Sequence, residues 1–410
     1  MKHLNTPIST HAMHDPLAAM RERFLIPEGV RYFDGNSLGM MPKAAALQTQ
    51  SVITQEWAHG LIRSWSDAGW HTLAKRTGAK IAALIGAAPE HVIACDSTSI
   101  NLFKTLSSAV RLRPGRSKIV TDSDAFPTDL YIIEQVAKLF DLSVVAVPAK
   151  EMLQALDHEV AAVVLTHVDY RSAEIYDMEI YTRATHAVGA LIVWDLSHTA
   201  GAVPCELDAC GADFAIGCGY KYLNGGPGAP GYLYVAARHI QDCEQPLAGW
   251  FGHARPFDFT QNYAPAAGIE RFLCGTNPVV GLSLLFHALD AFDGAALSDL
   301  REKSTRLTQH FIDGVEPRLA DHGFSIASPR EAQRRGSHVS LRHPQGYAVM
   351  RELTRRQIIG DFRMPDYMRF GFAPLYNTLQ EVDELIDAIE DIMLTGAWDK
   401  AEYRQRRDFT

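Results

Sequence analysis

The strongest constraint on the fold is a series of short, mainly apolar runs that alternate with helical patterns between residues 118 and 219. The runs are KIVTDS, LSVVAVP, AAVVLTHVD, ALIVWDLS and ADFAIGCG. Continuous apolar runs, without polar alternation, are typical of parallel strands that helices cover on both faces. The sequence therefore predicts an open α/β sheet, in which ligands bind beyond the carboxyl ends of the strands.

The length of 410 residues exceeds the usual size of one domain. Strand alternation fades after Pro278, and helical patterns follow at 298–319 and 379–393. We expect an N-terminal segment over 1–45 that packs on the small domain, a large sheet domain over 46–285 and a small α+β domain over 286–410.

Composition narrows the class of partner. The net charge is -9, and the basic residues are dispersed, which argues against binding to nucleic acid or to an anionic membrane. Six cysteines lack the paired spacing of a zinc site or a disulfide framework, so we expect no metal and a reducing cytoplasm. The sequence lacks a signal-peptide pattern and an apolar window of about 20 residues. A small molecule is the expected ligand.

Lys221 lies in the glycine-rich loop GYKYLNGGPG, directly after the apolar run ADFAIGCG. Most lysines lie on solvated surfaces, whereas glycines here allow a ligand to approach the backbone closely. Taken alone, a loop lysine is most often an ordinary surface residue.

Asp195 and His198 follow the run ALIVW, at the expected carboxyl end of another strand. The separation of 26 positions from Asp195 to Lys221 leaves room for one crossover and one more strand, so both groups can face one crevice. Pyridoxal phosphate requires such a pair, a lysine for the Schiff base and a carboxylate that keeps the pyridine nitrogen protonated. Taken alone, Asp195 fits a helix cap equally well.

The hydroxyl-rich segment DSTSIN at 96–101 precedes the helical pattern INLFKTLSSAV. Hydroxyls at a helix N-terminus bind phosphate well, although they are more often simple N-caps. This expected phosphate-binding segment, the Asp195 carboxylate and Lys221 follow one another along the chain in the order that pyridoxal-phosphate enzymes of the aspartate aminotransferase type use. The G-x-G-x-x-G match at 226–231 leads into a strand-like run, so we expect no dinucleotide site there.

Five segments together resemble the kynureninase family, and the resemblance covers nearly the whole chain. It implies fold type I, with a mainly parallel seven-stranded sheet in the large domain. It also implies the hydrolysis of L-kynurenine, and of 3-hydroxykynurenine, to anthranilate or 3-hydroxyanthranilate and L-alanine in tryptophan degradation. The segments are FDGNSLG at 33–39, FPTD at 126–129, WDLSHTAG at 194–201, GYKYLNGGPG at 219–228 and PLYN at 374–377.

The resemblance implies roles for cofactor-binding residues. Lys221 would carry pyridoxal phosphate covalently and act as the base at the substrate Cα, while Asp195 would pair with the pyridine nitrogen. Tyr220 would be the general acid and base, and we expect its pKa to be lowered by its surroundings. The remaining expected cofactor contacts are Thr98, Ser99, Phe126, Asp129, Thr166, His198, Trp250 and, from the partner subunit of a homodimer, Thr276.

For the substrate, the resemblance implies that Arg369 clamps the amino-acid carboxylate, because a guanidinium fits a carboxylate bidentately. Arg363 and Arg342 are less favoured candidates. The aryl ketone would contact Ser37 and Trp65, and Asn277 is a further expected substrate-binding residue. Trp57 and Trp70 leave the register of the tryptophan open, and a tryptophan there weakly favours kynurenine over its 3-hydroxy form.

Three other functions fit the sequence less well. A cysteine desulfurase needs a cysteine in a mobile C-terminal loop, but the sequence has no cysteine after Cys274. A class V aminotransferase on the same fold would require a keto-acid acceptor. A non-catalytic binding protein would usually have lost Lys221 or Asp195, and both are present.

Overall fold

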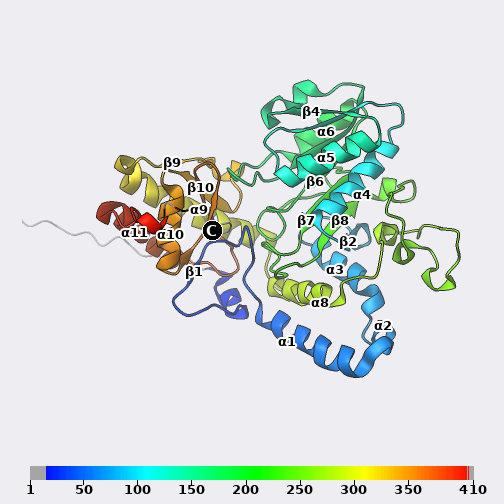
Figure 1. The fold of residues 1–410 in the computed structure, drawn as a ribbon, viewed down its shortest axis with the longest axis horizontal. Coiled ribbons are helices and arrows are strands. Elements are labelled where there is room, and N and C mark those ends of the chain that lie inside the picture. The colour runs from blue at the N-terminus through cyan, green and yellow to red at the C-terminus, as the bar shows by residue number, and fades with distance from the viewer. Residues whose placement is uncertain (1–14, 404, 406–410) are drawn as a thin grey trace, which may run out of the picture.

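The larger part of the computed structural model is built on a seven-stranded sheet flanked by helices (Figure 1). The structure describes residues 15–403 and 405, so the first part of the predicted N-terminal segment, 1–14, lies outside the described residues. The strand order is β2-β8-β7-β6-β5-β3-β4, and only β8 runs antiparallel to its neighbours. The predicted sheet is therefore confirmed. The strands are β2 (Val92–Ala94), β3 (Lys118–Asp122), β4 (Ser143–Val147), β5 (Val160–Thr166), β6 (Leu191–Asp195), β7 (Phe214–Cys218) and β8 (Gly231–Val235).

Helices cover both faces of the sheet at its central, mainly apolar strands. All residues of the central strands β5, β6 and β7 are buried, because side chains on both faces meet packed helices. Helix α4 crosses the middle of the sheet from β5 to β8 and begins directly after β2. The helices of this part are α1 (Lys43–Ser51), α2 (Ser64–Asp67), α3 (Leu73–Ala82), α4 (Thr98–Arg111), α5 (Pro127–Leu139), α6 (Met178–Ala187), α7 (Ala237–Ile240) and α8 (Val279–Ala288).

A second, four-stranded antiparallel sheet has the order β12-β13-β10-β9 and carries its own hydrophobic core. A short parallel pair, β1 with β11, joins the N-terminal segment to this part of the chain. The elements are β1 (Arg31–Tyr32), α9 (Leu297–Leu319), β9 (Ser325–Ile326), β10 (His338–Arg342), α10 (Gly346–Arg355), β11 (Ile358–Ile359), β12 (Asp361–Arg363), β13 (Tyr367–Gly371) and α11 (Leu379–Thr395).

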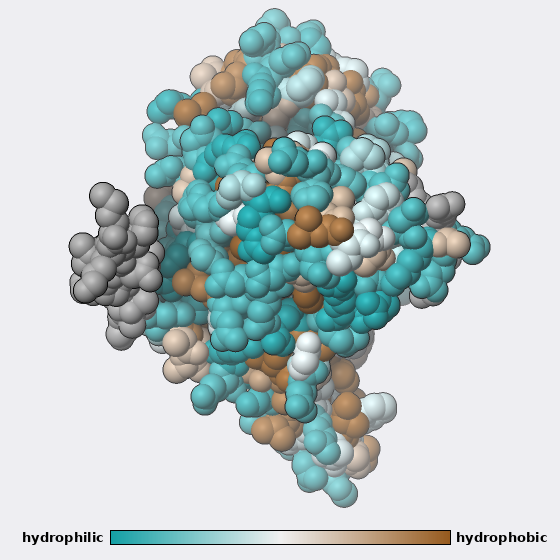
Figure 2. Space-filling view, turned by 90° about the vertical axis from the view of Figure 1, so that its left-hand side faces the viewer, coloured by the Kyte–Doolittle hydropathy of each residue, from teal (hydrophilic) through white to brown (hydrophobic). Residues whose placement is uncertain are grey.

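Helix α11 shows how local sequence sets its limits. Thr378 and Glu381 form a reciprocal capping box at its start, and Gly396 ends it in the left-handed conformation with a φ of 66°. Its apolar residues join the second core, whereas the outer face of this part of the molecule is mainly hydrophilic (Figure 2). The predicted helices at 298–319 and 379–393 are thus confirmed as α9 and α11.

Hydrophobic side chains of the large-sheet core continue beyond residue 285. Leu289, Phe292 and Leu300 still pack into the core of the large sheet, and the second core begins at Leu307 apart from Phe33. The boundary near residue 285 stays a prediction. Across the described residues no single helix is both long and apolar enough to cross a membrane, although the bent pair Val279–Phe292 and Leu297–His322 passes by length and composition.

Gly78 on α3 offers a test of how closely this helix approaches the sheet. A Cβ at Gly78 would lie 2.3 Å from the backbone oxygen of Val92 on β2. We expect Gly78→Ala to destabilise the fold by about 1–3 kcal/mol through overpacking, against the usual helical preference for alanine. The matched control is Gly281→Ala on α8, where the new Cβ would meet Pro230 at 3.4 Å, an ordinary contact. It should be neutral or stabilising by up to about 1 kcal/mol.

The midpoint of thermal unfolding of the two variants measures this difference. Equal midpoints would contradict the close packing of α3 on β2.

Candidate active site

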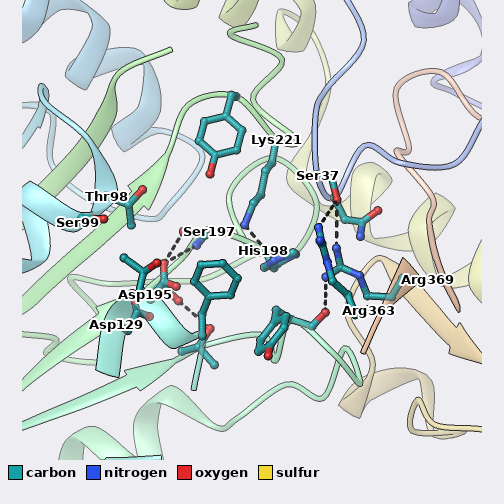
Figure 3. A pocket seen from close by; sticks show the side chains of 16 residues that line it. Ser37, Thr98, Ser99, Asp129, Asp195, Ser197, His198, Lys221, Arg363 and Arg369 are labelled. Carbon is teal, nitrogen blue, oxygen red and sulfur yellow. Dashed lines mark hydrogen bonds between the residues drawn. The ribbon is translucent and has the colours of Figure 1, made fainter. Parts of the chain in front are cut away.

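A cavity of about 240 Å³ lies between the carboxyl ends of the large sheet and the antiparallel sheet (Figure 3). Thr166 ends β5, Asp195 ends β6, Lys221 follows β7, and Thr98 begins the helix after β2. Parallel strands bring all of these ends to one edge. The cavity lining includes the following predicted site residues: Ser37, Thr98, Ser99, Phe126, Asp129, Thr166, Asp195, His198, Tyr220, Lys221 and Arg369.

The Lys221 amine points into the cavity, and its Nζ lies 3.0 Å from Nε2 of His198. His198 is buried. Burial, and then the charge of Lys221, lower the pKa of His198 well below its ordinary value. The ring is therefore neutral near pH 7, and its Nε2 is able to accept a hydrogen bond from the amine.

Two buried carboxyl groups, Asp129 and Asp195, form a hydrogen-bonded pair in the cavity. Burial raises the pKa of both, and the Asp195 charge raises that of Asp129 further. Asp195 Oδ1 also accepts hydrogen bonds from Ser197 N at 2.9 Å and from Ser197 Oγ at 2.6 Å, which favour its charged form. The shared proton therefore belongs to Asp129, and the negative charge belongs to Asp195.

Thr98 and Ser99 are the first residues of α4 and line the side of the cavity away from the arginines (Figure 3). Ser97 caps the helix by accepting a hydrogen bond from Ile100 N at 3.4 Å. Behind this turn the buried Lys104 Nζ donates to Asp96 Oδ2 and to the Phe272 carbonyl oxygen, both at 2.6 Å. The helix N-terminus is thus held in place and presents N–H groups, hydroxyls and the positive end of the helix dipole.

Tyr220 lines the cavity next to Lys221, but the expected direction of its pKa shift is wrong. Burial, followed by the charges of Cys218 and Asp195, raises the pKa of Tyr220. The expectation counted the neighbouring amine and the phosphate, whereas removal from water dominates. The hydroxyl therefore keeps its proton and acts as a donor.

Arg369, on β13, lies at the opposite side of the cavity from the α4 turn (Figure 3). Its Nε donates to Asp361 Oδ1 at 2.7 Å and its Nη1 to the Tyr170 carbonyl oxygen at 2.6 Å. Arg363 lines the same cavity, whereas Arg342 pairs with Asp366 and is not part of the lining. Of the less favoured arginines, only Arg363 is therefore placed to meet a ligand.

Four predicted site residues do not line the cavity of this single chain: Trp65, Trp250, Thr276 and Asn277. Trp65 packs against Trp70 and Phe251, with ring centroids 5.8 and 5.6 Å apart. Trp250 packs against Phe251 at 4.3 Å. Thr276 was expected to act on a partner subunit. The roles of all four stay predictions.

The residues of the cavity fit pyridoxal phosphate. The N-terminus of α4 suits a phosphate group, and the Asp129–Asp195 pair offers one negative charge to a protonated ring nitrogen. The amine of Lys221 lies beside both, on the side that faces the arginines (Figure 3). Within the described residues no group of three or more His, Cys, Asp or Glu side chains is arranged to hold a metal ion.

Sequence reasoning assigned no role to several residues that line the cavity: Asn36, Thr128, Tyr170 and Ser197. Asn36, Thr128 and Ser197 lie inside motifs that were recognised as blocks, so their position was available but not their contacts. Tyr170 directly follows the run AAVVLTHVD. Its position after a predicted strand is the sequence signal by which it could have been identified.

Comparisons with known proteins agree with this geometry. Residues 300–389 match the family described as kynureninase C-terminal domain. Kynureninases from Pseudomonas fluorescens and Burkholderia mallei (strain SAVP1) are 47% and 46% identical to the chain, over 97% of the chain and 97% of each relative.

Solved structures share the fold at lower identity. A cysteine desulfurase from Thermococcus onnurineus NA1 superposes with a TM-score of 0.79 at 20% identity, and 93% of this chain and 99% of that one are covered. A C-DES variant with glycine covalently linked to its pyridoxal-phosphate cofactor gives 0.79 at 15%, covering 90% and 99%. At these identities the likeness concerns the fold alone. With nearly full-length similarity to curated kynureninases, the chain belongs to the kynureninase family.

Proposed function

We propose that this chain is a pyridoxal-phosphate-dependent hydrolase that cleaves the Cβ–Cγ bond of L-kynurenine to give anthranilate and L-alanine. The observation that carries the proposal is the position of the Lys221 amine, which lies between the carboxyl pair on one side and Arg369 on the other (Figure 3). Membership of the kynureninase family supports the substrate. 3-Hydroxykynurenine is a second expected substrate.

Several side chains would hold the cofactor. Thr98 and Ser99 would bind its phosphate at the start of α4, and Phe126 would cover one face of its ring. Asp195, whose charge Ser197 stabilises, would keep the ring nitrogen protonated. When bound, pyridoxal phosphate supplies an electron sink for the carbanion at the substrate Cα.

Proton transfers would be shared by three side chains. The Lys221 amine takes the Cα proton, and the neutral His198 accepts a hydrogen bond from that amine and keeps it oriented toward the substrate. Tyr220 keeps its hydroxyl proton, because burial raises its pKa. It is therefore the group that gives a proton to the substrate carbon or to the leaving group.

Substrate recognition would fall to the antiparallel sheet and the N-terminal segment. Arg369 binds the α-carboxylate, and Ser37, which donates to Asp361 at 2.7 Å, lies beside it. Trp65 and Asn277 are proposed to contact the aryl ketone. An apolar tryptophan surface favours kynurenine over its 3-hydroxy form, because it offers no partner for an added hydroxyl.

We further propose that the active site is completed by a second copy of the chain. Large apolar side chains are exposed near Trp250, among them Phe257 and Phe259, which are 64% and 77% exposed. Exposed apolar groups of this size mark contact surfaces. A partner subunit that covers them would bring its Thr276 to the neighbouring cavity.

The test of the function is anthranilate fluorescence after the purified chain is mixed with L-kynurenine and pyridoxal phosphate. We expect turnover by the wild type and a loss of at least about 1,000-fold in Lys221→Ala, because no other amine of the cavity lining replaces this base. The matched control, Lys221→Arg, keeps the positive charge but forms no Schiff base, so it should be equally inactive. A wild type that releases no anthranilate would overturn the proposed function.

Ser197→Ala tests the charge on Asp195. Loss of the hydroxyl removes one of the hydrogen bonds that favour the charged carboxylate, so the pKa of Asp195 should rise and its hold on a protonated ring nitrogen should weaken. We expect the dissociation constant of pyridoxal phosphate to rise roughly tenfold, as for one hydrogen bond to a charged group. Absorbance titration measures it. Ser197→Thr retains a hydroxyl and should stay near the wild type, and equal affinity in both variants would contradict the assignment.

A further inference from the structure

Arg369 has few N–H groups left for a substrate. Its Nε and Nη2 donate to the two carboxylate oxygens of Asp361, and Nη2 also donates to Ser37 Oγ at 3.1 Å. Its Nη1 donates to the Tyr170 carbonyl oxygen. A guanidinium has five N–H donors, and these four hydrogen bonds leave one hydrogen, on Nη1. Arg369 by itself therefore cannot bind a carboxylate bidentately unless it releases Asp361 or Tyr170.

Arg363 lies beside it with donors to spare (Figure 3). Its side chain is 43% exposed, lines the cavity, and pairs through Nη2 with Asp361 Oδ2 at 2.7 Å. Among the described residues its buried Nε has no hydrogen-bond partner. Arg363 and Arg369 both contact Ser37 Oγ, so their guanidinium groups converge on one point.

The charges around this point leave a positive excess. Both guanidinium groups pair with the single carboxylate of Asp361. The other nearby carboxyl, Asp34, is buried, and burial together with the charge of Asp361 raises its pKa. Near neutral pH Asp34 is therefore only partly ionised, so it balances only part of the remaining positive charge. The positive charge of the two arginines therefore exceeds the negative charge of Asp361 and Asp34, and a bound anion would balance it.

We propose that Arg363 and Arg369 bind the α-carboxylate of the substrate together, the first with its free N–H groups and the second with the remaining Nη1 hydrogen. This inference rests on the proposed function and deepens it. Asp361 is then a positioning residue, because its carboxylate holds both guanidinium groups next to each other in the cavity. Arg363 becomes the residue that selects amino acids over amines and amides that lack the negative charge.

Steady-state kinetics with L-kynurenine test the proposal. We expect Arg363→Gln to raise KM roughly 10- to 100-fold, as for the loss of one or two charge-assisted hydrogen bonds, with kcat within about threefold of the wild type. Arg363→Lys keeps the charge without the planar fork and should give a smaller rise. Arg342→Gln is the matched control, because Arg342 pairs with Asp366 outside the cavity. Its KM should be unchanged.

A binding measurement separates this inference from the proposed function. L-Alanine and L-alaninamide differ in the charge of the carboxyl group, and absorbance of the bound cofactor reports the binding of each. The wild type should prefer L-alanine, and Arg363→Gln should lose at least about tenfold of that preference.

If Arg363→Gln kept the preference for L-alanine and a KM within twofold of the wild type, the inference would be overturned. The proposed function would still stand as long as the wild-type protein released anthranilate. If the wild type released no anthranilate, the function would fail, and the alanine preference would still decide the role of Arg363. If Arg363→Gln does not take up the cofactor, KM and the preference for L-alanine are measured in Arg363→Lys instead. Values unchanged from the wild type in that variant would also contradict the inference.

Discussion

A buried negative charge at the end of β6 is the constraint on which the site depends. Asp195 is 6% exposed and lies in a region where burial disfavours charge, so it stays ionised only with help. Asp129 provides a shared proton, and Ser197 and Lys221 provide a hydrogen bond and a positive charge. This arrangement is suited to a protonated heterocyclic nitrogen, because such a ligand adds a further positive charge beside the Asp195 carboxylate.

The two sheets contribute different groups to the cavity. The parallel sheet brings the carboxyl pair, the amine and the α4 N-terminus to one edge, and the antiparallel sheet carries Arg363 and Arg369 on adjacent strands. Tyr170 links the two, since the loop after β5 accepts a hydrogen bond from Arg369. Any shift of the small sheet relative to the large one would therefore move the two guanidinium groups relative to the Lys221 amine.

Much of the fold followed from pattern. The apolar runs predicted the strands, and the helical spacing at 379–393 predicted α11, because burial on both faces of a sheet and on one face of a helix dictates those patterns. The polar residues after the strands were found for the same reason. What single residues do in three dimensions was harder to predict. The direction of the Tyr220 pKa shift depends on desolvation. The N–H groups of Arg369 are largely occupied by hydrogen bonds to Asp361, a residue that lies outside the recognised motifs. The expected role of Thr276 depends on contacts between two subunits, which the pattern of one sequence does not encode.

The central claim is that one amine, that of Lys221, is joined covalently to the cofactor. Reduction of the pyridoxal-phosphate-loaded protein with borohydride, followed by proteolysis and mass spectrometry, tests this claim most directly. The account predicts a pyridoxyl group on the peptide that contains Lys221 and on no other. A label on a different lysine, or the absence of any label from protein that shows bound-cofactor absorbance, would contradict it.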